Sequence, residues 1–191
     1  YQTGLFPNII REYVQHIFLS ELYTLPNAEH LLFKGGTALR IIYGSPRFSE
    51  DLDFSASGIA GRAVEKVVED LFINVLTDIE RMGIQVEVGQ KSGETSGGYF
   101  GVATFTVTGF QQVSVEINVS ARDEKGIKGE VDSIANDFVP TYTLVHLPQE
   151  DLVEEKIFGA LRKRKKPRDF YDLYFMMRKN MLSVAHKKKL K

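Results

Sequence analysis

Residues 34–54 read KGGTALRIIYGSPRFSEDLDF, and this stretch decides the fold. The apolar run LLF at 31–33 precedes it and has the composition of a short buried strand. Two glycines, Gly35 and Gly36, then lead directly into TALRIIY, whose apolar spacing predicts a helix beginning near Thr37. We therefore predict a unit of strand, glycine turn and helix.

A second strand closes the stretch. The GSP at 44–46 ends the helix, because glycine and proline are strong helix breakers. DLDFSA then alternates polar and apolar residues, which places Leu52 and Phe54 on one face of a strand and Asp51 and Asp53 on the other. Two carboxylates are therefore expected side by side on one polar face.

Paired carboxylates indicate a metal site for phosphate chemistry. Two like charges this close repel, and without a cation the pKa of at least one carboxyl would rise. Mg²⁺, or Mn²⁺ in its place, removes the repulsion because it binds carboxylate and phosphate oxygens together. Glu116 stands on the polar face of a later predicted strand and would complete a three-carboxylate cluster for two-metal phosphoryl transfer if that strand lies beside Asp53. A solvated strand face is the alternative for Asp51 and Asp53.

Gly35 and Gly36 provide the second half of such a site. A strand that ends in Gly-Gly and turns into a helix exposes backbone N–H groups at the positive end of the helix dipole, which favours a phosphate. No Lys-Ser or Lys-Thr follows these glycines, so the stretch is not a P-loop. A plain tight turn is the alternative.

Composition limits the class of protein. The chain has 191 residues, of which 43% are hydrophobic and 26% charged, as expected of a folded domain with or without a smaller helical appendage. No apolar run is long enough for a membrane span and no segment resembles a signal peptide, so we expect a cytoplasmic protein. The absence of cysteine excludes disulfides and thiolate catalysis, and the four histidines lack metal-binding spacing.

The remaining sequence predicts further helices and strands. Apolar spacing predicts a helix that begins at Pro7 and ends before Pro26, and a long helix near 59–82. Three β-rich runs separated by polar turns indicate an antiparallel meander, at 84–90, 99–107 and 112–120. Residues 121–142 have few periodic signals and are predicted to be a connection with short structure, and two more helices are predicted at 149–166 and 167–179.

The C-terminal part is basic, although the whole chain carries 24 Lys and Arg against 25 Asp and Glu. Basic runs attract phosphates in a salt-dependent manner, and a solvated charged face is the alternative. Nucleic-acid contact is therefore predicted at Arg162, Lys163, Arg164, Lys165, Lys166 and Arg168, and the family resemblance described below favours RNA. The aromatic residues that follow are predicted to be mainly core, with base stacking as the alternative: Phe170, Tyr171, Tyr174 and Phe175.

Two distant stretches carry a resemblance to a known family. KGGTALRIIYGSPRFSEDLDF looks like the AbiEii/AbiGii toxin branch of the polymerase β-like nucleotidyltransferases, and KIFGALRKRKKPRDFYDLYFM at 156–176 resembles that branch's second signature, a lysine followed by R…RDxYDL. The resemblance implies an α+β fold with a mixed sheet, flanking helices and a C-terminal helical part. We place the catalytic domain at 1–147 and the helical part, which completes the nucleotide cleft, at 148–191.

The resemblance also implies roles for individual residues. Catalysis is expected of Asp51, Asp53, Glu116, Lys156 and Asp172, with Asp51, Asp53 and Glu116 as the metal ligands. Nucleotide binding is expected of Lys34, Gly35, Gly36, Arg40, Arg47, Ser49 and Lys156, and Arg164, Arg168 and Asp169 would line or brace the pocket. Because Asp169 and Asp172 lie three apart on one helix, they could pair with Arg168, Arg47 or Lys156 across the cleft.

The function implied by the resemblance is Mg²⁺-dependent transfer of a nucleoside monophosphate from a nucleoside triphosphate to an acceptor hydroxyl, with release of pyrophosphate. The expected acceptor is RNA, in particular tRNA. The protein would be the toxin of a toxin–antitoxin system in phage defence, with a cognate antitoxin as its partner. Two alternatives stay open, namely transfer to a protein hydroxyl and a catalytically silent nucleotide- or RNA-binding module.

Overall fold

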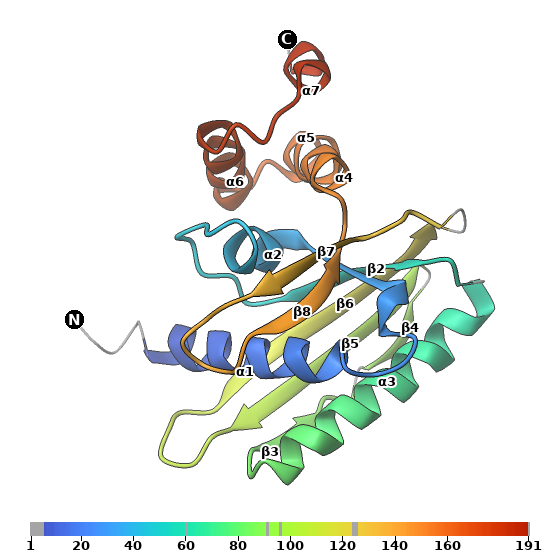
Figure 1. Cartoon of the computed structure of the whole chain (residues 1–191), viewed down its shortest axis with the longest axis vertical. Helices are drawn as coiled ribbons and strands as arrows, with labels where there is room; N and C mark the ends of the chain where they lie inside the picture. Colours follow the sequence, from blue (N-terminus) through green and yellow to red (C-terminus); the bar gives the residue numbers. More distant parts are fainter. Residues whose placement is uncertain (1–5, 60, 91, 96, 124–125, 191) are drawn as a thin grey trace.

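The structure, a computed structural model, describes residues 6–59, 61–90, 92–95, 97–123 and 126–190. Within these ranges, eight strands form one mixed sheet in the order β3-β5-β6-β2-β1-β8-β7, with β4 paired to β5 (Figure 1). The strands are β1 Leu31–Lys34, β2 Leu52–Ser57, β3 Gln85–Val88, β4 Gly93–Thr95, β5 Gly98–Thr106, β6 Val113–Asp123, β7 Glu130–Ile134 and β8 Tyr142–His146. β2 runs antiparallel to β1 and parallel to β6, so strands from distant parts of the chain meet at the centre.

Two helices cover one face of the sheet. α1 (Phe6–Leu22) and α3 (Gly61–Arg81) pack against each other and against the strands (Figure 1). Phe18 of α1 meets Phe72 of α3 with ring centroids 5.5 Å apart, and Phe72 lies 6.4 Å from Phe54 of β2. The face of β2 that carries Phe54 is therefore the core face.

The central strands alternate between this core and the opposite face. Leu52 and Phe54 of β2 are fully buried, so Asp53 between them projects from the other side of the sheet, as predicted. β6 repeats the pattern, with Ile117 and Val119 buried on either side of Asn118. A row of polar side chains therefore lies on the face that α1 and α3 do not cover.

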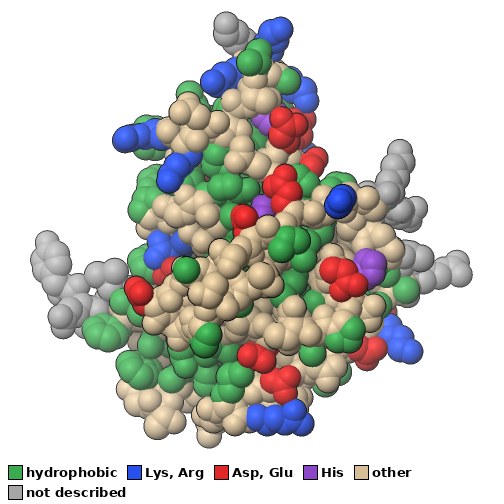
Figure 2. Space-filling model, in the orientation of Figure 1, with side chains coloured by type: hydrophobic (Ala, Val, Ile, Leu, Met, Phe, Trp, Pro, Cys, Tyr) green, Lys and Arg blue, Asp and Glu red, His purple; other side chains and the backbone are tan. Residues whose placement is uncertain are grey.

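The C-terminal helical part covers that polar row. It consists of α4 Gln149–Glu154, the π-helix η2 Glu155–Leu161, α5 Arg162–Arg164, α6 Pro167–Arg178 and α7 Val184–Lys189. The predicted helix 149–166 is thus present, but its middle is π-helical. The predicted domain boundary at 147/148 falls between β8 and α4, yet Leu152, Ile157 and Met176 join the same buried cluster as the sheet. Figure 2 shows Lys and Arg side chains around these helices at the top of the view.

The connection with short structure predicted at 121–142 contains the five-residue strand β7. Four of the five residues of β7 are exposed, and an edge strand of this kind lacks the apolar alternation that identifies strands in a sequence. Residues 124 and 125 lie outside the described residues.

The predicted meander is confirmed by the antiparallel pairing of β5 with both β3 and β6. The helix after the two glycines, α2 (Gly35–Ile41), begins two residues before the predicted Thr37. The remaining short helix is the 3-10 turn η1 (Ala28–His30).

The prediction of core aromatic residues on α6 is wrong for three of the four. Phe175 is 7% exposed, whereas Phe170, Tyr171 and Tyr174 are 53%, 38% and 55% exposed. The reason is that α6 buries a single stripe, which contains Asp172 and Phe175, and its remaining surface meets no other element that covers it. None of the described helices is long and apolar enough to cross a membrane.

Candidate active site

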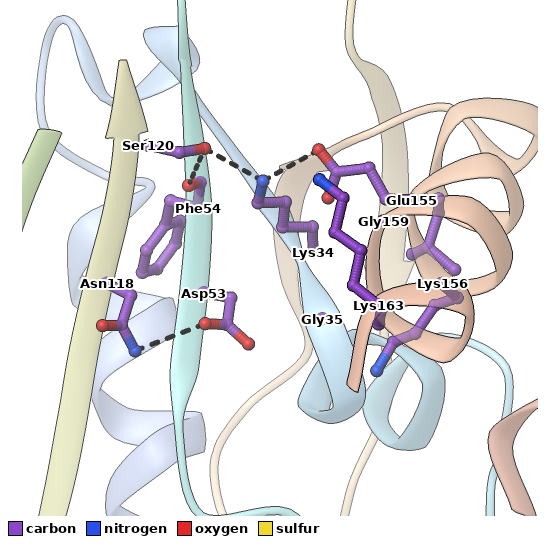
Figure 3. A pocket seen from close by; sticks show the side chains of 12 residues that line it. Lys34, Gly35, Asp53, Phe54, Asn118, Ser120, Glu155, Lys156, Gly159 and Lys163 are labelled. Atoms are coloured by element: carbon purple, nitrogen blue, oxygen red, sulfur yellow. Dashed lines mark hydrogen bonds and ion pairs between the residues drawn. The ribbon is translucent and has the colours of Figure 1, made fainter. Parts of the chain in front are cut away.

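A cleft lies between the polar face of the sheet and the C-terminal helices. It consists of two adjoining pockets of about 340 and about 330 Å³ that share Asp53, Asn118 and Lys156. Figure 3 shows Asp53 and Asn118 on neighbouring strands, facing the helical segment that carries Lys156. The first pocket is completed by Lys34, Gly35, Phe54, Ser120, Leu152, Glu155, Gly159, Ala160 and Lys163, and the second by Gly36, Arg47, Ser49, Asp51 and Arg168.

The two glycines allow the chain to approach the carboxylates closely. Gly35 has φ +85°, a conformation that side chains disfavour, and a Cβ atom there would collide with the Asp53 carboxylate. A Cβ atom on Gly36 would lie 2.7 Å from Arg47 Nη2 and 2.8 Å from Ser49 Oγ. Glycine is therefore required at position 35, a side chain at position 36 would displace the ends of Arg47 and Ser49, and the start of α2 lies directly against Asp53.

Asp53 is the carboxylate that both pockets share. Burial raises its pKa above the ordinary value, and the charge of Asp51 raises it further. The cations Lys156 and Lys34 and the hydrogen bond from Asn118 act in the opposite direction on this pKa but do not cancel the rise. Asp51, whose backbone carbonyl accepts a hydrogen bond from Thr37, shares the second pocket with Asp53. A divalent cation between the two carboxylates would relieve both the repulsion and the desolvation.

Asp172 holds two cations at the opposite side of the cleft. It is 1% exposed and accepts hydrogen bonds from Arg47 Nε at 3.0 Å and Arg47 Nη2 at 3.1 Å, and from Lys156 Nζ at 2.7 Å. The predicted pairing of Asp172 across the cleft is therefore present. Asp172 itself lines neither pocket. In this structure it positions Arg47 and Lys156, and both of these side chains line the cleft. Two cations that share one carboxylate leave a net positive charge beside Asp51 and Asp53.

Lys34 joins the sheet to the C-terminal helices. Its Nζ donates to Ser120 Oγ of β6 at 3.0 Å and to Glu155 Oε1 of η2 at 2.9 Å (Figure 3). Lys34 thus lines the cleft, as expected of a nucleotide-binding residue, and its two partners were not among the predicted site residues. Ser120 and Asn118 alternate with buried apolar residues of β6, and this polar face was the available signal for both.

Arg40 lies outside the cleft, contrary to the prediction. Its guanidinium pairs with both carboxylate oxygens of Glu12, at 2.8 and 2.7 Å, and sits 4.0 Å from the centre of the Phe48 ring. α2 buries the face of Thr37 and Ala38 against the sheet, and Arg40 at the end of this short helix is directed to α1 instead. Its role is to fix α2 to α1, while Ser49 does line the cleft as predicted.

Glu116 does not join the carboxylates. The register of β2 and β6 pairs Asp53 with Asn118, and Asn118 Nδ2 donates to Asp53 Oδ1 at 3.3 Å. Glu116, two residues earlier on the same face, is exposed and lines neither pocket. Within the described ranges, no three acidic or histidine side chains lie together as a metal site. The strand does lie beside Asp53, but its register places an amide where we predicted the third carboxylate.

The basic segment 162–168 divides between the cleft and the surface. Lys163 lines the first pocket and Arg168 the second, whereas Lys165 and Lys166 are exposed and line neither. Arg162 does not line either pocket, and its Nη2 donates a hydrogen bond to the backbone carbonyl of Lys189 at 2.6 Å. The side chain of Arg164 lies outside the described residues. In the same region, the Asp169 carboxylate accepts a hydrogen bond from the Lys166 backbone N–H at 3.0 Å, which caps the start of α6.

Fold and site together define the class of the protein. A mixed sheet that presents a carboxylate pair beside a Gly-Gly helix start, with cations supplied by a C-terminal helical part, is the architecture of a nucleotidyltransferase. The chain belongs to the family of the nucleotidyl transferase AbiEii toxin of type IV toxin–antitoxin systems, whose model matches residues 17–190.

Two solved structures share the fold. A candidate nucleotidyltransferase from H. pylori is 20% identical with a TM-score of 0.67, over 95% of this chain and 74% of the other. JHP933 from Helicobacter pylori is also 20% identical, with a TM-score of 0.69, over 96% of this chain and 72% of the other. No curated protein matches the sequence.

Proposed function

We propose that the protein transfers a nucleoside monophosphate from a nucleoside triphosphate to an acceptor hydroxyl. The observation that carries this proposal is the second pocket, where Asp51 and Asp53 face Arg47 and Lys156 across a cleft of about 330 Å³. Carboxylates for a metal on one side and cations for phosphate oxygens on the other are the two requirements of phosphoryl-transfer sites. The AbiEii family membership supports the same reaction class.

The residues of the cleft fit Mg²⁺ or Mn²⁺. Asp51 and Asp53 offer hard oxygen donors, and burial, followed by the charge of Asp51, raises the pKa of Asp53, an effect that a bound cation would oppose. Mg²⁺ in nucleotide enzymes is held by one or two carboxylates together with substrate phosphates, so a third protein carboxylate is not required. When bound, the ion would polarise the α-phosphate and lower the pKa of the attacking hydroxyl.

The chain's own residues would bind and orient the triphosphate. The bare backbone at Gly35 and Gly36 admits phosphate oxygens close to the carboxylates. The acceptor oxygen forms a bond to the α-phosphorus, the bond between the α-phosphorus and the bridging oxygen breaks, pyrophosphate leaves, and the hydroxyl proton is released to solvent. Lys156 and Arg47, held by Asp172, stabilise the charge that develops on the pyrophosphate.

The proposed acceptor is RNA, with tRNA as the preferred kind. Lys163 and Arg168 line the cleft from the C-terminal side, and further exposed cations adjoin them at Lys165 and Lys166. A cluster of this kind binds phosphates without regard to sequence. As a member of a type IV toxin family, the protein would act as a toxin in phage defence and be restrained by an antitoxin protein.

The test is a transfer assay with two positions of the label. Purified protein, Mg²⁺ and total RNA are incubated with each nucleoside triphosphate labelled at the α- or at the γ-phosphate. Label should reach RNA from the α-position alone, because a nucleotidyl group and not a phosphoryl group is transferred, and Asp53→Asn should abolish it. Products that resist RNase and yield to protease would replace RNA with protein as the acceptor. Absence of transfer to either, or equal transfer by Asp53→Asn, would overturn the proposal.

A further inference from the structure

The exposed side of α6 carries a further cavity, separate from the two pockets of the cleft, that the proposed reaction does not use. It has a volume of about 390 Å³ and is lined by Gly44, Pro46, Tyr171, Tyr174, Phe175, Arg178 and Lys179. Tyr171 and Tyr174 are 38% and 55% exposed, so their rings are available to a partner. We call the four residues Tyr171, Tyr174, Arg178 and Lys179 the α6 platform.

The charge of the α6 platform is positive. Arg178 and Lys179 are its ionisable cations, and no acidic side chain is among the described residues that line this cavity. Arg178 Nη1 donates to Tyr174 Oη at 3.2 Å and its guanidinium lies 5.9 Å from the centre of the Tyr174 ring, so the cation is held beside the ring. Lys179 Nζ lies 5.9 Å from the centre of the Phe175 ring. Aromatic faces combined with fixed cations suit a ligand that has both flat rings and negative charge.

The α6 platform is continuous with the candidate active site along one side of α6. Arg168, Tyr171, Phe175 and Arg178 follow one another at spacings of three or four residues, which places them in one row on the helix. Arg168 lines the cleft at one end and Arg178 lines the cavity at the other. At a rise of ~1.5 Å per residue the row is about 15 Å long, the length of about four stacked nucleotides.

The loop before β2 forms the other wall of the same path. Pro46 lines the cavity on α6, and Arg47, the next residue, reaches into the cleft and binds Asp172 of α6. Because the Arg47–Asp172 pair closes the gap between this loop and α6, a strand that lies on the platform would reach the cleft across the outer side of that pair. Both sites therefore take residues from α6 and from this loop, which places the cavity beside the entrance of the cleft.

We infer that the α6 platform binds unpaired nucleotides of a single-stranded RNA segment and leads its end into the cleft. This inference rests on the proposed function, because it assigns the platform to the acceptor of that reaction. Tyrosine rings stack on any base, and Arg178 and Lys179 bind the intervening phosphates, which gives recognition that tolerates many sequences. A base-paired duplex presents no free base faces and would not use the rings.

The test measures RNA binding without nucleoside triphosphate or metal. Fluorescence anisotropy is recorded with a short fluorescein-labelled single-stranded oligoribonucleotide and with a blunt RNA duplex. Tyr171→Leu and Tyr174→Leu should each weaken single-strand binding at least roughly fivefold, because each removes one stacking ring, and should leave duplex binding unchanged. Tyr174→Phe keeps the ring and should retain most of the affinity. Arg178→Gln should reduce the slope of log affinity against log salt by about 0.7, the value for one phosphate contact on a single strand.

Phe170→Leu is the matched control, because Phe170 is an exposed aromatic residue of the same helix that does not line the cavity. It should bind as the unchanged protein does. The inference is overturned if both tyrosine variants bind the single strand like the control, or if Phe170→Leu weakens binding as much as they do. Binding to an acidic peptide that depends on the two tyrosines, with RNA binding unaffected, would assign the platform to a protein partner instead and would also overturn it.

The outcome is separable from that of the transfer assay. Tyrosine-dependent RNA binding in a protein that transfers no label would leave the platform standing and the proposed function refuted. If transfer requires Asp53 but Tyr171→Leu and Tyr174→Leu change neither transfer nor RNA binding, the proposed function stands and the role of the α6 platform is refuted.

Discussion

Replacement of Asp172 by asparagine should strongly destabilise the protein, because Asp172 is the single carboxylate between Arg47 and Lys156. Asparagine has the same shape but no charge, so the variant leaves two cations facing each other. Removing one partner of a buried ion pair costs about 3–5 kcal/mol. The Arg47 side chain is 23% exposed and that of Lys156 is 11% exposed, so water compensates part of this loss.

We therefore expect Asp172→Asn to lower the free energy of unfolding by about 3 kcal/mol, at the lower end of that range. At about 2–4 °C per kcal/mol for a chain of this size, the melting temperature should fall by about 6–12 °C. Urea unfolding at neutral pH measures the free energy directly, and calorimetry measures the melting temperature.

Lys156→Met supplies the matched control. It removes one of the two cations and leaves Arg47 balanced by Asp172, so it should destabilise the protein much less than Asp172→Asn. The double variant should be more stable than the sum of the two single effects predicts, because the charge that Asp172→Asn leaves unbalanced is then partly removed. A loss below about 1 kcal/mol for Asp172→Asn, or a larger loss for Lys156→Met, would refute the assignment of Asp172 as the group that holds both cations.

Three further predictions concern the same region and its supports. Lys156→Met should lower nucleotidyl transfer about 100-fold, as does the loss of other groups that stabilise transition-state charge, and single-turnover kinetics with saturating triphosphate would reveal an effect confined to binding. Gly35→Ala should destabilise by about 1–3 kcal/mol in urea unfolding because of its φ of +85° and its contact with Asp53, whereas Gly44→Ala, with open space around it at φ +74°, should show the backbone cost alone. Burial lowers the pKa of His16, and a histidine whose pKa is lower in the folded state contributes stability that is lost as the pH falls. The urea concentration at the unfolding midpoint should therefore decrease as the pH falls below about 6.5, and it should decrease less in His16→Gln. An equal decrease in both proteins would exclude His16 as the source of this pH dependence.

The local features of the site were predictable from sequence because each depends on near neighbours. The alternation of Leu52 and Phe54 with Asp53 follows from strand geometry, and the unit of strand, Gly-Gly and helix follows from local composition. The pairing of Asp172 with Arg47 and Lys156 was expected as one of several pairings, and the structure selected it. β7 could not be predicted, because an exposed edge strand has no buried face to mark it.

The sequence by itself determined the family, the core face of β2 and the basic character of the C-terminal part, because these properties depend only on the order and spacing of residues along the chain. Only the tertiary structure decided which groups meet. A strand register is set by contacts between segments far apart in the chain, and here it places Asn118 beside Asp53 and leaves Glu116 outside the cleft. The direction of a helix face is likewise set by packing, which turned Arg40 to Glu12 and left Tyr171 and Tyr174 exposed on α6.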